Sequence, residues 1–181
     1  ALALTANTTG GRLTAVGYKA LTANTTGVNN VAVGCEWSGL TGTLGSNTTG
    51  GSNVAMGDAA LGANTTASNN TAIGTLALRS NTTGALNTAV GSASLGANTT
   101  ASGLTAIGKD ALSANTTGSD NTAVGNGTLV SNTTGTRNVA IGSSQNGVDV
   151  GTLALNTTGD NNTALGFKAL RSNTTADNNT A

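Results

Sequence analysis

The tripeptide Asn-Thr-Thr is the chemically most distinctive element of this sequence, and it occurs ten times. It begins at Asn7, Asn24, Asn47, Asn64, Asn81, Asn98, Asn115, Asn132, Asn156 and Asn173. Asn-x-Thr is the acceptor sequence for N-linked glycosylation. The same asparagines, stacked at regular intervals, can instead form ladders of side-chain amides. Because all ten matches come from one repeated element, we favour amide ladders over glycosylation.

Other residues capable of chemistry are few. Cys35 is the only cysteine and there is no histidine, so an intrachain disulfide, a Cys/His zinc site and a histidine general base are excluded. The acidic residues are scattered, without a recurring carboxylate pair. The sequence therefore predicts no enzyme, no catalytic residue, no metal site and no cofactor. Cys35 is expected to be a small buried side chain.

A 17-residue repeat positions all of these residues. Successive Asn-Thr-Thr elements are 17 residues apart, except for two larger steps of 23 and 24. Numbered from the first Asn, the unit is N-T-T-G-x-x-N-T-A-V-G-x-x-A-L-x-x. Unit position 9 is always Ala, position 11 is Gly in all nine complete units, position 15 is always Leu, and position 10 is always apolar but varies in size.

This unit predicts an all-β fold. Seventeen residues are too few for a helical-hairpin repeat, and Gly, Asn and Thr are poor helix formers. We expect one strand at unit positions 7–11, a second at 1–3 and a third short piece from 14. The prediction is a parallel β-solenoid, or β-roll, of about ten coils, forming one repeat array over residues 1–181.

Strand alternation divides the side chains between two faces. We expect unit positions 8 and 10 to fill the interior, because they carry Thr or Val and an apolar residue. Positions 9 and 11 would then face outward. Their fixed Ala and Gly indicate close packing against another copy of the chain. The alternative is that the glycine only serves a turn with positive φ, which leaves the fixed Ala unexplained.

Two insertions interrupt the repeat after unit position 11, over residues 35–42 and 143–151. They carry the only tryptophan, Trp37, and the only glutamate, Glu36. An exposed Trp37 with Glu36 would be a candidate contact for a receptor or glycan. The alternative, which we favour, is a loop folded back on its own coil.

Composition excludes several classes of protein. Seven basic residues balance seven acidic ones, so the chain lacks the basic footprint of a nucleic-acid-binding protein. Its apolar runs are too short for membrane insertion. Twelve of the fourteen charged residues lie at unit positions 5, 6, 12, 13 and 16, which we interpret as solvent corners. The regular recurrence of Val, Ile and Leu argues against disorder.

The motifs at residues 121–125 (NTAVG), 138–142 (NVAIG) and 53–57 (NVAMG) resemble the repeat of trimeric autotransporter adhesin heads. The longer pattern A-L-x-x-N-T-T-G-x-x-N-T-A-x-G is similar to repeats in phage tail fibres. The resemblance covers essentially the whole chain, although its unit is longer than that of the adhesin heads. It implies a homotrimeric β-roll fibre located outside the cell, on a cell surface or on a virion.

The leading hypothesis is thus a structural fibre segment of a surface adhesin, phage fibre or extracellular filament, acting as a stiff spacer and display scaffold. Its partners would be further copies of itself, either as a homotrimer or joined end to end. Because the array starts and stops part-way through a unit, we expect uncapped ends within a longer fibre. The alternative is a single-chain solenoid whose Thr/Asn face binds ice or a polysaccharide, and inward-facing Thr columns would exclude it.

Overall fold

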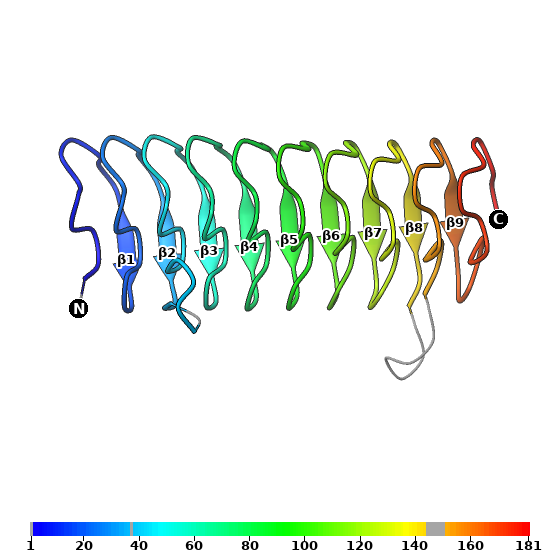
Figure 1. Ribbon diagram of the computed structural model, residues 1–181, viewed down its shortest axis with the longest axis horizontal. Helices are drawn as coiled ribbons and strands as arrows, with labels where there is room; N and C mark the ends of the chain where they lie inside the picture. Colours follow the sequence, from blue (N-terminus) through cyan, green and yellow to red (C-terminus); the bar gives the residue numbers. More distant parts are fainter. Residues whose placement is uncertain (1, 37, 144–150) are drawn as a thin grey trace.

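The computed structural model describes residues 2–36, 38–143 and 151–181. These residues form a β-solenoid without any helix, and Figure 1 shows its coils stacked in a row from one terminus to the other. Each coil contributes one strand of three residues. The strands are β1 (Thr14–Val16), β2 (Val31–Val33), β3 (Val54–Met56), β4 (Thr71–Ile73), β5 (Thr88–Val90), β6 (Thr105–Ile107), β7 (Thr122–Val124), β8 (Val139–Ile141) and β9 (Thr163–Leu165). The predicted all-β, parallel solenoid is confirmed.

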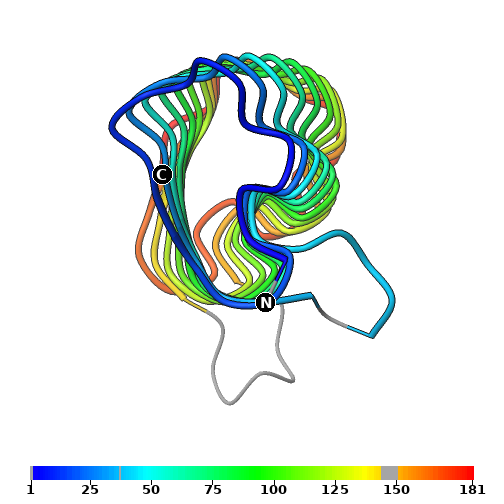
Figure 2. The same ribbon diagram turned by 90° about the vertical axis from the view of Figure 1, so that its left-hand side faces the viewer.

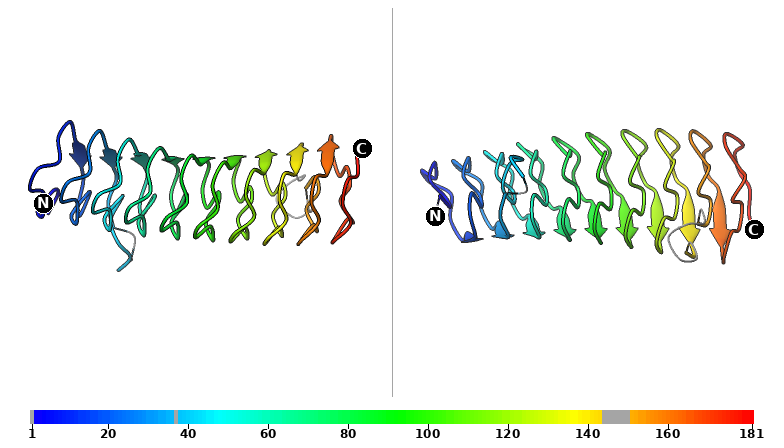
Figure 3. Two further views of the ribbon diagram at one scale, coloured as in Figure 1. Left: turned by 90° about the horizontal axis from the view of Figure 1, so that it is seen from above. Right: turned by 60° about the horizontal axis from the view of Figure 1, so that its bottom comes forward.

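The nine strands form one parallel sheet in sequence order, β1 to β9. Every pairing joins the same unit positions, so that Ala72 lies beside Ala89 and Thr71 beside Thr88. The pairing of β2 with β3 keeps this register across the insertion at 35–42. Figure 3 shows the strands as a single row along the stack. Each unit position therefore becomes a straight column of side chains along the solenoid axis.

The prediction of two or three strands per coil is wrong, whereas the prediction of about ten coils differs only slightly from the structure. Nine strands occur in the described residues, one per coil, and the last unit adds only an isolated bridge between Thr163 and Thr180. Unit positions 1–3 form bends instead of a strand. There the N–H groups of Thr25, Thr26 and Gly27 all point to the carbonyl oxygen of Thr48. This convergence satisfies the backbone between coils without the evenly spaced bonds of a β-ladder.

Turns complete each coil, and leucine at unit position 15 is their anchor. This leucine has a left-handed backbone in all ten units, with φ between 49° and 54°. That conformation costs about 1–2 kcal/mol for an L-residue. It directs a side chain such as that of Leu78 into the interior, where it is fully buried, and burying a leucine contributes about 2–3 kcal/mol. Burial thus outweighs the backbone strain.

The interior contains the opposite face of the strand from the one expected. Alanine at unit position 9 is fully buried from β2 to β8 and joins the leucines of position 15 in one core cluster. Positions 8 and 10 point outward. The prediction that they fill the interior is therefore wrong. Leucine and asparagine side chains already occupy the inside of the narrow coil, so the inward face of the strand has room for a methyl group only. Figure 2 views the molecule along the axis of the stack, with the coils one behind another.

The glycine at unit position 11 is explained within the chain, so the prediction that another copy packs against it is also wrong. A Cβ added to Gly91 would lie 2.6 Å from the carbonyl carbon of Gly108 in the next coil, and Gly91 has a φ of +131°. Both the close approach of the coils and the backbone conformation therefore require glycine there. The turn explanation is correct for position 11, while the fixed Ala is an interior residue.

Two columns of asparagine run inside the solenoid. At unit position 1, Asn81 Nδ2 donates to Asn64 Oδ1 (3.1 Å), and Asn98 Nδ2 donates to Asn81 Oδ1 (2.9 Å), so the amides form a ladder. At unit position 7 the ladder is mostly between side chain and backbone: Asn70 Oδ1 accepts from the Asn87 N–H, and Asn70 Nδ2 donates to the Gly84 carbonyl. The predicted ladders are confirmed, with this different pairing at position 7.

Candidate self-association surface

The outward face of the sheet carries the largest unexplained feature of the molecule, a continuous apolar column. It consists of the side chains at unit position 10 of β1 to β9, which are Val, Met, Ile or Leu. Their exposed fractions reach 39% for Ile73, 57% for Val16 and 68% for Leu165. Surface hydrophobic residues are normally scattered singly. A contiguous exposed apolar patch marks an interaction site.

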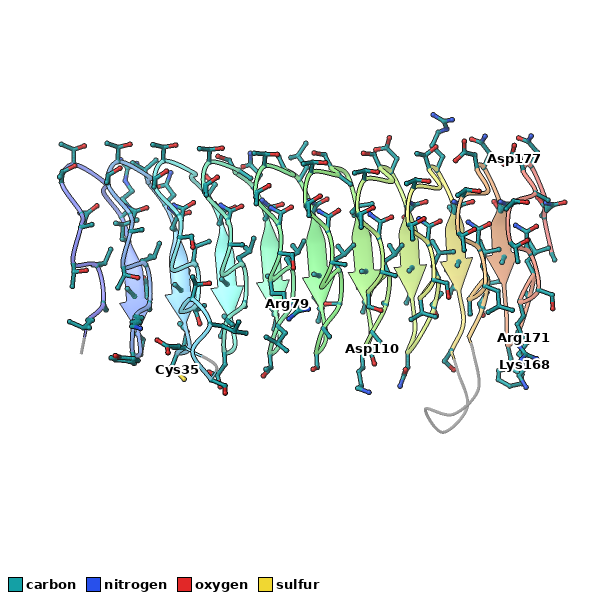
Figure 4. The ribbon with its side chains drawn as sticks, in the orientation of Figure 1. Cys35, Arg79, Asp110, Lys168, Arg171 and Asp177 are labelled. Atoms are coloured by element: carbon teal, nitrogen blue, oxygen red, sulfur yellow. The ribbon has the colours of Figure 1, made fainter. Side chains whose placement is uncertain are left out.

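The neighbouring column on the same face is unit position 8, which is Thr in six strands and Val in three. The Thr hydroxyls of this column make no side-chain hydrogen bond within the part of the chain that the structure describes. We call positions 8 and 10 of β1 to β9 together the outward strip. It contains no charged residue. In Figure 4, Asp110, Lys168 and Arg171 lie at one edge of the stack and Asp177 at the other.

The local sequence makes this strip unavoidable. In a three-residue strand, positions 8 and 10 share a face while position 9 has the opposite one. Only alanine fits the interior, so the two larger side chains must point out. The parallel, unshifted register then aligns them from coil to coil. One sequence signal could have identified this surface: positions 9 and 15 never vary in size, as tight packing demands, whereas position 10 ranges from Val to Met.

The insertion at 35–42 leaves the stack at the end of β2 and projects beyond it (Figure 2). Its base is tied to the coils on both sides. The Cys35 N–H and Sγ both donate to Asp58 Oδ1, at 3.2 and 3.1 Å. On the other side, Lys19 Nζ forms an ion pair with Glu36 Oε2 and lies 5.3 Å from the Tyr18 ring centroid.

These contacts decide part of what the sequence left open. Glu36, a predicted partner contact, forms its ion pair with Lys19 of its own chain. Residues 38–41 are exposed and project from the stack (Figure 2), so the loop is anchored at its base and is not folded back along its length. Trp37, the other predicted contact, lies outside the described residues, as does most of the second insertion. Cys35 was expected to be buried, but its side chain is only half-buried. The hydrogen bond to Asp58 raises the pKa of its thiol, which disfavours a reactive thiolate.

Glycosylation of the Asn-Thr-Thr elements conflicts with the folded structure. Asn81 is fully buried, and its Nδ2, the atom that would carry a glycan, donates two hydrogen bonds. The second threonine of each element faces outward instead, as Thr83 and Thr100 do. The hydroxyl of the first threonine is used between coils: Thr82 Oγ1 donates to the Thr99 carbonyl at 3.0 Å. The second threonines of successive elements therefore form one exposed column along the stack.

Among the described residues, no group of three or more His, Cys, Asp or Glu side chains could hold a metal ion. The same part of the chain has no helix that is long and apolar enough to cross a membrane. The outward strip is thus the surface that calls for a functional explanation. No protein-family model matches the chain, and neither a curated protein nor a solved structure matches it.

Proposed function

We propose that this chain is a structural fibre segment that associates side by side with identical copies, as a parallel homotrimer, through the outward strip. The observation that carries the proposal is the uncharged apolar column that continues through all nine strands. Completing the burial of this column is the interaction that the single chain lacks.

Three properties of the strip favour another copy of the same chain as its partner. A second solenoid has the same axial rise per coil, so its contacts repeat without mismatch along the whole length. The absence of charge on the strip means that a symmetric contact brings no like charges together. The strip is only two columns wide, which suits several chains meeting around a common axis better than one broad two-chain interface.

The magnitudes require the whole column to take part. Burying the remaining half of an exposed aliphatic side chain contributes about 1 kcal/mol. Nine such side chains contribute about 9 kcal/mol, similar to the roughly 4–15 kcal/mol that association costs in lost motion. Two or three coils would not hold chains together, whereas a long array would. A long array of coils thus extends the fibre and also provides enough buried surface for the chains to associate.

In this proposal the function is mechanical. Each coil is hydrogen-bonded to the next through its strand, its bends and its asparagine columns, which favours a stiff spacer that displays its corners. The resemblance to adhesin-head and tail-fibre repeats supports a place outside the cell, on a cell surface or on a virion. The corner loops would be the sites of contact with a receptor or glycan.

The test is the mass of the chain in solution by light scattering over a range of concentrations, for the natural sequence and for Ile107→Asp. Ile107 is 41% exposed, so the single chain should fold with Asp there. In the assembly, an unpaired buried carboxylate would cost several kcal/mol per chain. We expect a trimer for the natural sequence and a monomer for Ile107→Asp. Thr100→Asp, on the exposed threonine column, is the matched control and should remain trimeric. A natural chain that stays monomeric would refute the proposal.

A second candidate function is supported by the exposed threonine column. Because Thr83, Thr100 and their equivalents face outward, the condition that would exclude a threonine-faced binding surface is not met. The structure offers one complete threonine column, because the outward column at unit position 8 has valine in three strands, whereas an ice-binding surface needs at least two threonine columns in register. Thermal hysteresis of ice growth tests this candidate. Activity that disappears on replacing the column by Ala would favour it, and absence of hysteresis would leave the fibre proposal.

A further inference from the structure

A uniform strip leaves the axial alignment of two copies undetermined. If every coil presented the same outward side chains, a neighbouring chain could slide by one coil, about 4.8 Å, and make the same contacts. A fibre with a defined structure needs something that distinguishes one alignment from the others. The outward strip contains such a feature.

Unit position 8 is Val in β2, β3 and β8 and Thr in the other six strands. Val31, Val54 and Val139 therefore make three layers of the strip apolar in both columns. The order of these layers along the axis is not periodic: two are adjacent, and the third follows five coils later. For parallel chains, zero offset superposes all three layers. A shift of one, five or six coils superposes one, and any other shift superposes none.

The side chains make matched layers favourable. Valine and threonine have nearly the same shape, so sliding does not cause a steric clash, but it places a threonine hydroxyl against valine methyl groups. A buried hydroxyl without a partner is costly. The strip threonines have no side-chain hydrogen bond of their own in the described residues. At zero offset threonine meets threonine, and such pairs can bond across the contact.

The insertions agree with this pattern. They follow β2 and β8, two of the three strands that carry valine at position 8. The base of the first insertion is held to the coils on either side by the Lys19–Glu36 and Cys35–Asp58 contacts. Two of the three doubly apolar layers therefore lie at levels of the stack where the repeat is interrupted by an insertion. At zero offset, each insertion would lie at the same level as the corresponding insertion of a neighbouring chain.

We infer that Val31, Val54 and Val139 act as a register key, which fixes parallel copies of this chain at zero axial offset. The inference rests on the proposed side-by-side association. It names the partner as an identical chain, and it assigns the three valines a role that no single chain requires, because threonine occupies the same position in six other coils.

Distances between spin labels test the key in the full chain. On a Cys35→Ser background, Thr100→Cys carries the label, since Thr100 is exposed and lies off the strip. Chains at zero offset around a common axis should give one narrow distance. Two variants remove the pattern in opposite ways: one changes the three strip valines to Thr, and the other changes the six strip threonines to Val.

Both uniform variants should give several distances, although one is less apolar than the natural strip and the other more so. The all-valine variant should associate at least as strongly as the natural chain. It therefore tests the register key even if the all-threonine variant dissociates. A single unchanged distance in the all-valine variant, or several distances in the natural sequence, would overturn the key. Absence of any distance between chains would instead contradict the association itself. A matched control changes Thr49, Thr66 and Thr117, on the exposed threonine column, to Val and should keep the single distance.

Discussion

Replacing one asparagine of the interior ladder should destabilise the solenoid far more than replacing a threonine two residues away. Asn81 lies in the middle of the stack and is fully buried. Its Nδ2 donates to Asn64 Oδ1 and to the Gly84 carbonyl, and its Oδ1 accepts from Asn98 Nδ2. Asn81→Ala removes all three hydrogen bonds.

The remaining partners set the magnitude. The Gly84 carbonyl keeps its bond from Asn70 Nδ2, and Asn98 Nδ2 keeps its bond to the Ala101 carbonyl. Asn64 Oδ1 accepts no other hydrogen bond within the described residues, so it becomes an orphaned buried acceptor. Three lost bonds at about 1 kcal/mol each, with about 1–2 kcal/mol for the orphaned oxygen, predict a loss of about 4–5 kcal/mol.

Asn81→Asp separates the need for a donor from the need to fill space. The carboxylate can still accept from Asn98, but it cannot donate to Asn64 or Gly84, and it buries a charge. At neutral pH it should therefore be at least as destabilising as Ala. Protonation restores one donor, so the difference from the natural chain should shrink as the pH falls.

Urea denaturation monitored by circular dichroism measures these effects. The matched control is Thr83→Ala, because Thr83 is exposed and makes no side-chain hydrogen bond within the described residues. It should change stability by less than about 0.5 kcal/mol. If Asn81→Ala were no worse than Thr83→Ala, the idea that the ladder stabilises the stack would be refuted.

Three further predictions concern backbone strain and the corner thiol. Leu86 is 64% exposed with φ 62°, so Leu86→Asn should raise stability by about 1 kcal/mol; an unchanged or lower melting temperature would contradict this. Gly91→Ala should cost at least about 2 kcal/mol, because the new Cβ meets Gly108 and adopts a strained φ; a loss below about 0.5 kcal/mol in urea would show that the coils can separate there. Asp58→Asn removes the charge whose hydrogen bond raises the pKa of Cys35, so alkylation of the thiol at pH 8 should become faster; an unchanged rate would mean that access and not ionisation limits the reaction.

Much of this fold follows from periodicity alone. The 17-residue unit predicted the solenoid, a strand within unit positions 7–11, of which the structure has 8–10, and the asparagine ladders, because each depends only on identical residues recurring at one spacing. The bends at positions 1–3 were missed. Thr25 and Thr26 have β-forming side chains, but their N–H groups share one acceptor in the next coil, and composition does not show that geometry.

The two strand faces were interchanged for a physical reason. Alternation shows that Thr88 and Val90 share a face, but it does not say which face is inside. Apolarity favoured the larger residues for the interior. Side-chain volume decides otherwise, since Leu95 and the asparagine columns leave space only for Ala89. Constancy of size is the better guide to the interior of a narrow coil than hydrophobicity.

The claim that the outward strip is where copies meet can be tested by chemical protection. On a Cys35→Ser background, Val90→Cys places a thiol on the strip and Thr100→Cys places one on the exposed threonine column. Alkylation rates of the two thiols are measured at increasing protein concentration and in the unfolded chain. We predict that alkylation of Val90→Cys becomes at least about tenfold slower as the chains associate, which corresponds to about 1.4 kcal/mol or more of protection. The alkylation rate of Thr100→Cys should not change. Equal rates at both positions in an associated sample would contradict it and place the contact elsewhere.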